Sequence, residues 1–149
     1  MSENDEDRLL HEICRNSGMG VEAIQQVLKD VYDEEFAYEL HAEAGKMREF
    51  EQKAGERLNQ NGKEAGKTKP MAAKMLKSAV KMRTVVTDST SHMAELMQKG
   101  NRRGAEELKK AIHKYKDAGV YATELARDMV DFEEDNLKKL ARFKDNRNE

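Results

Sequence analysis

Asn16-Ser-Gly-Met-Gly-Val-Glu-Ala-Ile-Gln-Gln-Val-Leu-Lys-Asp-Val-Tyr-Asp33 has a counterpart later in the chain, Gly100-Asn-Arg-Arg-Gly-Ala-Glu-Glu-Leu-Lys-Lys-Ala-Ile-His-Lys-Tyr-Lys-Asp117. At a constant offset of 84 positions, Gly20 falls on Gly104 and Leu28 falls on Ile112. Apolar residues in both stretches recur every three or four positions, which is typical of an amphipathic helix. The pattern indicates that one helical segment is present twice.

The similarity extends into the helical stretch that follows each copy. Residues 49–58 match residues 131–140 at an offset of 82, including a Phe-Glu pair in each. Two hairpins separated by a long connector predict a four-helix bundle with one long crossover. We expect a single all-α domain in which hairpins at residues 7–60 and 89–144 are joined by a crossover, residues 61–88, that carries an extra helix.

The glycines of the first copy do not break the helical phase. Apolar spacing persists across Gly18 and Gly20, so one helix over about residues 7–32 is expected. Glycine weakens a helix locally, but it also lets a neighbouring backbone approach closely. We therefore expect Gly20 and Gly104 at packed positions, and a Gly104→Ala substitution is expected to be mild or stabilising.

Start and stop signals mark the ends of the other helices. Asp33 suits the N-cap of a second helix, and Gly62 is typical of a helix stop. Pro70 suits the first turn of the crossover helix, residues 70–83. Ser89 suits the start of the next helix, and Asp117-Ala-Gly119 is expected to be the turn before the last one.

Composition narrows the classes of function. The chain has 27 basic and 29 acidic residues, a balance that gives no global reason to expect a nucleic-acid partner. Cys14 is the only cysteine, which suits a reducing compartment. The N-terminus is acidic and polar, unlike a signal peptide, and no apolar run approaches the length of a membrane span. A cytoplasmic protein is expected.

At the level of the whole chain, the sequence resembles the ferritin-like superfamily, and more narrowly small uncharacterised bacterial ferritin-like proteins. The resemblance implies the plan of hairpin, crossover and hairpin, but no established activity. It rests on Asn16–Glu22 with Asp30–Phe36, on Arg48-Glu-Phe50, on Lys81–Thr84 with Ser89–Glu95, and on Phe132–Leu137.

Di-iron members of that superfamily place a Glu on each of two helices and Glu-x-x-His on each of the other two. None of the four histidines of this chain follows a Glu by three positions, and Asn136 stands three residues after Glu133. Asn is a poor substitute for imidazole at an iron site. We therefore predict that the chain binds no iron pair, and we expect no cofactor or catalytic residue.

Several carboxylates are candidates if a metal site exists at all. The low-ranking candidates are Glu22, Glu106, Glu51 and Glu133. The acidic residues of the second helix, including Glu39 and Glu43, are interpreted as a solvated face. Cys14 is interpreted as a buried small hydrophobic residue.

The leading hypothesis from sequence is a non-enzymatic cytoplasmic bundle with a structural or protein-interaction role, through self-association or an unknown protein partner. One alternative is a ferritin-like metal-binding or oxygen-handling protein with a degenerate carboxylate site. A second is peripheral binding to anionic membranes through the basic helix 70–83, which carries lysines but lacks Trp and Phe. Membrane and nucleic-acid partners are not expected.

Overall fold

The computed structural model describes residues 4–64 and 89–144, and within these it contains four α-helices and no strand. The helices are α1 (Asp5–Leu28), α2 (Glu34–Gln60), α4 (Thr90–Lys114) and α5 (Val120–Lys144). This confirms the all-α four-helix bundle. The crossover helix expected at 70–83 lies outside the described residues.

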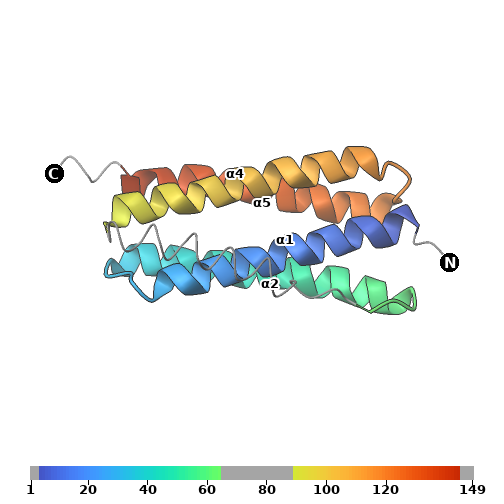
Figure 1. Ribbon diagram of the computed structural model, residues 1–149, viewed down its shortest axis with the longest axis horizontal. Helices are drawn as coiled ribbons and strands as arrows, with labels where there is room; N and C mark the ends of the chain where they lie inside the picture. Colours follow the sequence, from blue (N-terminus) through green and yellow to red (C-terminus); the bar gives the residue numbers. More distant parts are fainter. Residues whose placement is uncertain (1–3, 65–88, 145–149) are drawn as a thin grey trace.

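The four helices form a bundle of two antiparallel pairs (Figure 1). α1 packs along α2, and α4 packs along α5. α1 also contacts α4 and α5, and α2 contacts α5. The chain leaves α2 at one end of the bundle and enters α4 at the opposite end (Figure 1).

The start and stop signals lie where the sequence places them. The Asp33 carboxylate accepts a hydrogen bond from the backbone N–H of Phe36 at 2.9 Å, and the Ser89 hydroxyl accepts one from that of His92 at 3.1 Å. Gly62 and Gly119 both have positive φ, at 76° and 88°. Such a backbone conformation favours glycine and ends the preceding helix.

α1 runs through Gly18 and Gly20 without a break, as the spacing predicts, but it ends at Leu28 rather than near Tyr32. Asp33 caps α2 five residues beyond Leu28. The intervening residues turn the chain back, and the backbone N–H of Asp30 donates to the carbonyl of Val27. The predicted end was too late because the apolar residues Val31 and Tyr32 continue the helical pattern into the turn.

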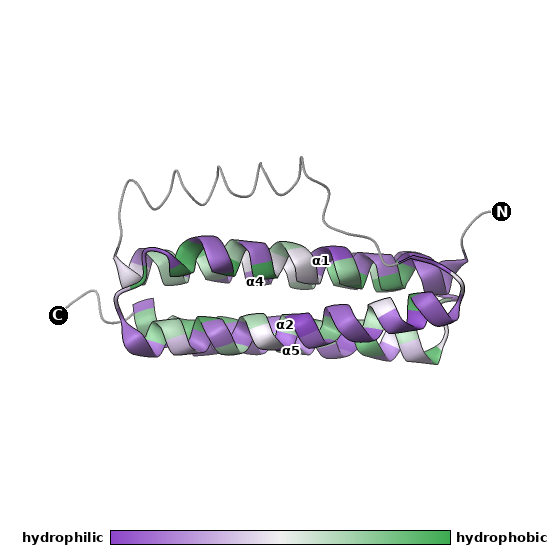
Figure 2. Ribbon diagram, turned by 90° about the horizontal axis from the view of Figure 1, so that it is seen from below, coloured by the Kyte–Doolittle hydropathy of each residue, from purple (hydrophilic) through white to green (hydrophobic). Residues whose placement is uncertain are grey.

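The core consists of two hydrophobic clusters, and Figure 2 shows how hydrophobic and hydrophilic residues alternate along the helices. One cluster includes Leu9, Leu58 and Leu125, near the turn between α4 and α5. The other includes Val27, Phe36 and Phe143, near the turn between α1 and α2. Between the clusters lie six buried polar side chains, here called the polar layer: Asn16, Ser17, Glu43, Asn101, Glu133 and Asn136.

Among the residues that the structure describes, no helix is both long enough and apolar enough to cross a membrane.

The Asp33 cap is expected to contribute measurably to stability. Asp33→Ala removes the acceptor for the Phe36 N–H, so the free energy of unfolding should fall by about 1 kcal/mol in urea titrations. Asp33→Asn keeps an acceptor oxygen and is the matched control. Equal losses in both variants would show that the charge of Asp33, not its hydrogen bond, stabilises the start of α2.

Candidate functional site

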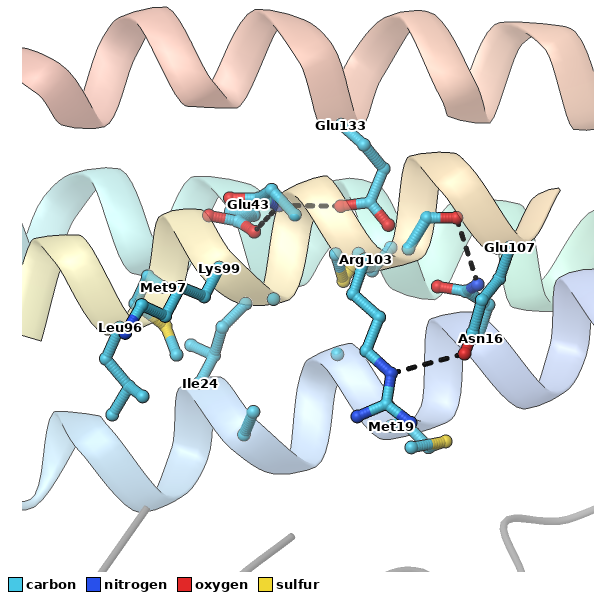
Figure 3. A pocket seen from close by; sticks show the side chains of 16 residues that line it. Asn16, Met19, Ile24, Glu43, Leu96, Met97, Lys99, Arg103, Glu107 and Glu133 are labelled. Atoms are coloured by element: carbon cyan, nitrogen blue, oxygen red, sulfur yellow. Dashed lines mark hydrogen bonds and ion pairs between the residues drawn. The ribbon is translucent and has the colours of Figure 1, made fainter. Parts of the chain in front are cut away.

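A single side-chain amide joins two buried carboxylates at the centre of the polar layer. Asn101 on α4 donates from Nδ2 to Glu43 Oε2 on α2 at 2.8 Å and to Glu133 Oε1 on α5 at 2.6 Å. Glu43 is 5% exposed, Asn101 2% and Glu133 1%. Figure 3 shows the two carboxylates approaching each other from different helices. This constellation therefore holds three helices together through one polar contact.

Burial changes the acidity of both carboxylates. The pKa of Glu133 is raised to about 8, mainly by loss of hydration. The hydrogen bond from Asn101 lowers this pKa, and the nearby Glu43 raises it. Loss of hydration likewise raises the pKa of Glu43 to about 7, with Asn101 and Lys139 lowering it and Glu39 raising it. The pair therefore exchanges protons near neutral pH.

Some polar atoms of the layer have no partner among the described residues. These atoms are Asn101 Oδ1 and Asn136 Nδ2, and both belong to side chains at least nine-tenths buried. A buried polar atom without a hydrogen bond costs about 1–3 kcal/mol. Asn101 therefore uses its donor on the two carboxylates and leaves its acceptor available.

Gly104 makes room for the carboxylate of Glu133. A Cβ atom at Gly104 would lie 2.2 Å from Glu133 Oε2 and 2.9 Å from Asn16 Oδ1. The Asn16 amide in turn donates to the Gly104 carbonyl at 3.4 Å. A Cβ at Gly20, the counterpart in α1, would lie 2.2 Å from Met47 Sδ. Both glycines occupy packed positions, but side chains rather than a backbone fill the space beside them.

A pocket of about 240 Å³ leads from the surface between α1 and α4 to this pair of carboxylates. Glu43, Asn101 and Glu133 form its inner end, and the exposed residues Lys99, Gly100 and Arg103 lie at its rim. Figure 3 shows Arg103 beside Glu107. Arg103 Nε donates a hydrogen bond to Glu107 Oε2 at 3.2 Å. The walls are mainly apolar: Met19, Ala23, Ile24, Met47, Leu96 and Met97.

The four metal candidates from the sequence do not share one place. Glu133 belongs to the polar layer, whereas Glu22 and Glu51 are half-buried and Glu106 is exposed. In the described part of the chain, no three His, Cys, Asp or Glu side chains are grouped so that they could hold a metal ion. Of these candidates, the structure brings only Glu133 to the centre of the bundle.

Glu43 was assigned to a solvated acidic face, and this was wrong, since its side chain is 5% exposed. Its position carries the signal that was overlooked. Glu43 lies three residues after Leu40 and four before Met47, both of which are buried on the same face of α2. Asn101 lies four residues after Met97 and four before Ala105 on α4 in the same way.

Cys14 is buried, as expected, with burial and the nearby Glu51 raising the pKa of its thiol to about 11. A thiol with so high a pKa is a poor nucleophile at neutral pH. Asp7 is also buried, and its carboxylate accepts a hydrogen bond from the Asn61 amide at 2.9 Å. That contact ties the start of α1 to the end of α2.

Comparisons with known proteins contribute no relative: no family model, curated protein or solved structure matches the chain.

The raised pKa values predict an unusual dependence of stability on pH. In the unfolded chain both glutamates lose their protons near pH 4.5, but in the fold they keep them to about pH 7 and pH 8. The folded state therefore binds more protons, and stability should fall as pH rises from about 5 to 8. The slope is at most about 1.4 kcal/mol per pH unit for each group.

Urea titrations of the wild type and of Glu133→Gln at pH 6, 7 and 8 measure this effect. Glu133→Gln removes one titrating group and keeps an acceptor for Asn101, so it should be more stable than the wild type at pH 8 and should show a shallower slope. Parallel slopes for the two proteins would contradict ionisation of Glu133 in this range.

Because the side chains of Glu133 and Asn16 fill the position of a Cβ at Gly104, an alanine there is expected to destabilise the fold, not to be mild or stabilising. Gly104→Ala should lower the melting temperature, because overpacking costs about 1–3 kcal/mol and exceeds the gain in helix propensity of about 1 kcal/mol. Gly100→Ala is the matched control, since a Cβ at Gly100 meets nothing within 4 Å and should stabilise α4. If the melting temperatures of both variants rose equally, the Glu133 side chain would be moving aside at no cost in free energy.

Proposed function

We propose that this protein is a non-enzymatic helical bundle of the ferritin-like plan, acting in the cytoplasm, whose interior binds a positively charged ligand. The single observation behind the binding function is the pair of buried carboxylates at the inner end of an open pocket. A cation at that end would compensate the charge that burial otherwise opposes.

Burial at equivalent positions supports the ferritin-like plan and the internal repeat. At an offset of 84, Ile13 and Met97 are both buried, and so are Ile24 and Leu108. At an offset of 82, the buried residue Met47 matches the buried residue Met129. The position of α4 at the opposite end from the end of α2 also agrees with one long crossover (Figure 1). That residues 7–58 superpose on 90–143 stays a prediction.

The binding proposal develops the sequence alternative of a degenerate carboxylate site. Two carboxylates and an amide oxygen are hard ligands of the kind that Mg²⁺, Ca²⁺ or Mn²⁺ prefer, but they are fewer than a tight metal site uses. A metal ion bound there would keep several water ligands. The absence of an iron pair also stays a prediction, and anaerobic loading with Fe(II) followed by dialysis and metal counting tests it.

The structural or protein-interaction role has less support from the surface. The large exposed apolar side chains of the described residues are divided between the two ends of the bundle. Tyr32 and Tyr38 lie at the α1–α2 end, whereas Val120 and Tyr121 lie at the start of α5. They do not form one continuous docking face. Membrane binding through helix 70–83 concerns residues outside those described.

Ligand-dependent stability tests the binding function. The wild type and a Glu43→Gln/Glu133→Gln double variant are melted at pH 8 with a panel of cations: Mg²⁺, Ca²⁺, Mn²⁺ and short alkylammonium ions. At a concentration of about 100 times Kd, a cation that binds only the fold adds about 2.7 kcal/mol of stability. At least one member should raise the melting temperature of the wild type.

The double variant should not respond to that cation, because its side chains carry no charge at these two positions. The proposal is overturned if no member of the panel raises the melting temperature of the wild type more than that of the double variant. Sodium chloride at matched ionic strength controls for screening of surface charge.

A further inference from the structure

From the pocket between α1 and α4, we infer that the ligand is a compact organic amine with an apolar body and no second positive charge. This inference rests on the proposed cation-binding function and names the class of cation. It follows from three features of the pocket: the acceptors at its inner end, its walls and its rim.

The inner end of the pocket offers acceptors to a donor-rich group. Glu133 places Oε2 in the space beside Gly104, close to Asn16 Oδ1. Asn101 is 2% exposed, lines the pocket and has no partner for Oδ1. A primary ammonium group carries three N–H donors and no acceptor. It therefore complements a carboxylate and an unpaired amide oxygen better than a neutral hydroxyl group does.

The walls favour an organic cation over a metal ion. They consist mainly of aliphatic and thioether side chains, among them Ile24, Met47 and Met97. Such side chains supply no hard oxygen ligand to a divalent ion, but they provide an apolar surface on which the methylene groups of a ligand are favourably buried. Methionine is flexible and adapts to the shape of a small ligand. A volume of about 240 Å³ limits the ligand to a compact molecule.

The rim disfavours a second positive charge on the ligand. Lys99 and Arg103 lie there on α4, and both are exposed. Glu107 is 3.2 Å from Arg103 and 3.8 Å from Arg15, whose nearer partner is Glu12 at 2.7 Å. Two carboxylates therefore face the two guanidinium groups, and the ammonium group of Lys99 is additional. The rim therefore has a positive balance of charge. A diamine long enough to reach the rim would meet repulsion that a monoamine avoids.

Gly100 permits a test that leaves the carboxylates intact. It lies at the rim of the pocket, and a Cβ atom there meets nothing within 4 Å, so Gly100→Leu places a side chain across the opening while raising helix propensity. Gly45 on α2 is the matched control: a Cβ there also meets nothing within 4 Å, and Gly45 does not line the pocket. Gly45→Leu should therefore leave binding unchanged.

Binding of n-butylamine, 1,4-diaminobutane and n-butanol to the full chain is measured by titration calorimetry at pH 7.5. The wild type and Gly45→Leu should bind n-butylamine with equal affinity. The affinity of Gly100→Leu and of Glu133→Gln for n-butylamine should be lower by at least about tenfold. The diamine should bind more weakly than n-butylamine, and n-butanol more weakly still. Circular dichroism melts confirm that both leucine variants are folded.

The inference is overturned if n-butylamine does not bind, if Gly100→Leu binds it as the wild type does, or if n-butanol or the diamine binds as tightly. A wild type that responds to Mn²⁺ or another metal through Glu43 and Glu133, but not to n-butylamine, would overturn the amine and leave cation binding in place. A wild type that responds to neither would overturn both proposals.

Discussion

The contact on which the centre of this bundle depends is the Asn101 amide between Glu43 and Glu133, at 2.8 and 2.6 Å. Two buried carboxylates repel each other when both are ionised, and an amide can donate one N–H to each without adding charge. The residue types found beside this contact are those that accommodate it. Gly104 leaves space for one carboxylate, and Asn16 binds the backbone beside it. The apolar core accordingly divides into two clusters rather than continuing through the middle.

The architecture was largely readable from the sequence because it rests on local signals. The spacing of apolar residues predicts the helices, and Asp33, Ser89, Gly62 and Gly119 act through groups only a few residues away. The end of α1 was misplaced because Val31 and Tyr32 continue the apolar pattern into the turn, so that periodicity alone does not show where the chain reverses.

The candidate site was less predictable because it is formed by helices that are distant in sequence. Glu43 and Glu133 are 90 positions apart in the sequence, and the residues next to Glu43 do not indicate that it contacts a residue of α5. Charged residues are rarely buried, which made a solvated face the natural interpretation for Glu43. The offset that relates the hairpins also misleads here: Glu51 is the counterpart of Glu133, yet Glu51 is only half-buried and Glu43 takes the central place. The central polar groups of the bundle therefore do not follow the sequence offset.

The division of the polar layer between the two hairpins has a consequence for the order of folding. Glu43 belongs to the α1–α2 hairpin, whereas Asn101 and Glu133 belong to the α4–α5 hairpin. Each hairpin forms through contacts between neighbouring segments, and such local contacts form fast. The two carboxylates lose their water only when the hairpins dock. Proton uptake therefore belongs to the docking step, and alkaline solution should slow assembly of the two halves while leaving each hairpin free to form. In a concentrated solution, hairpins delayed in this way have time to pair with those of another chain, which is the route to a domain-swapped dimer.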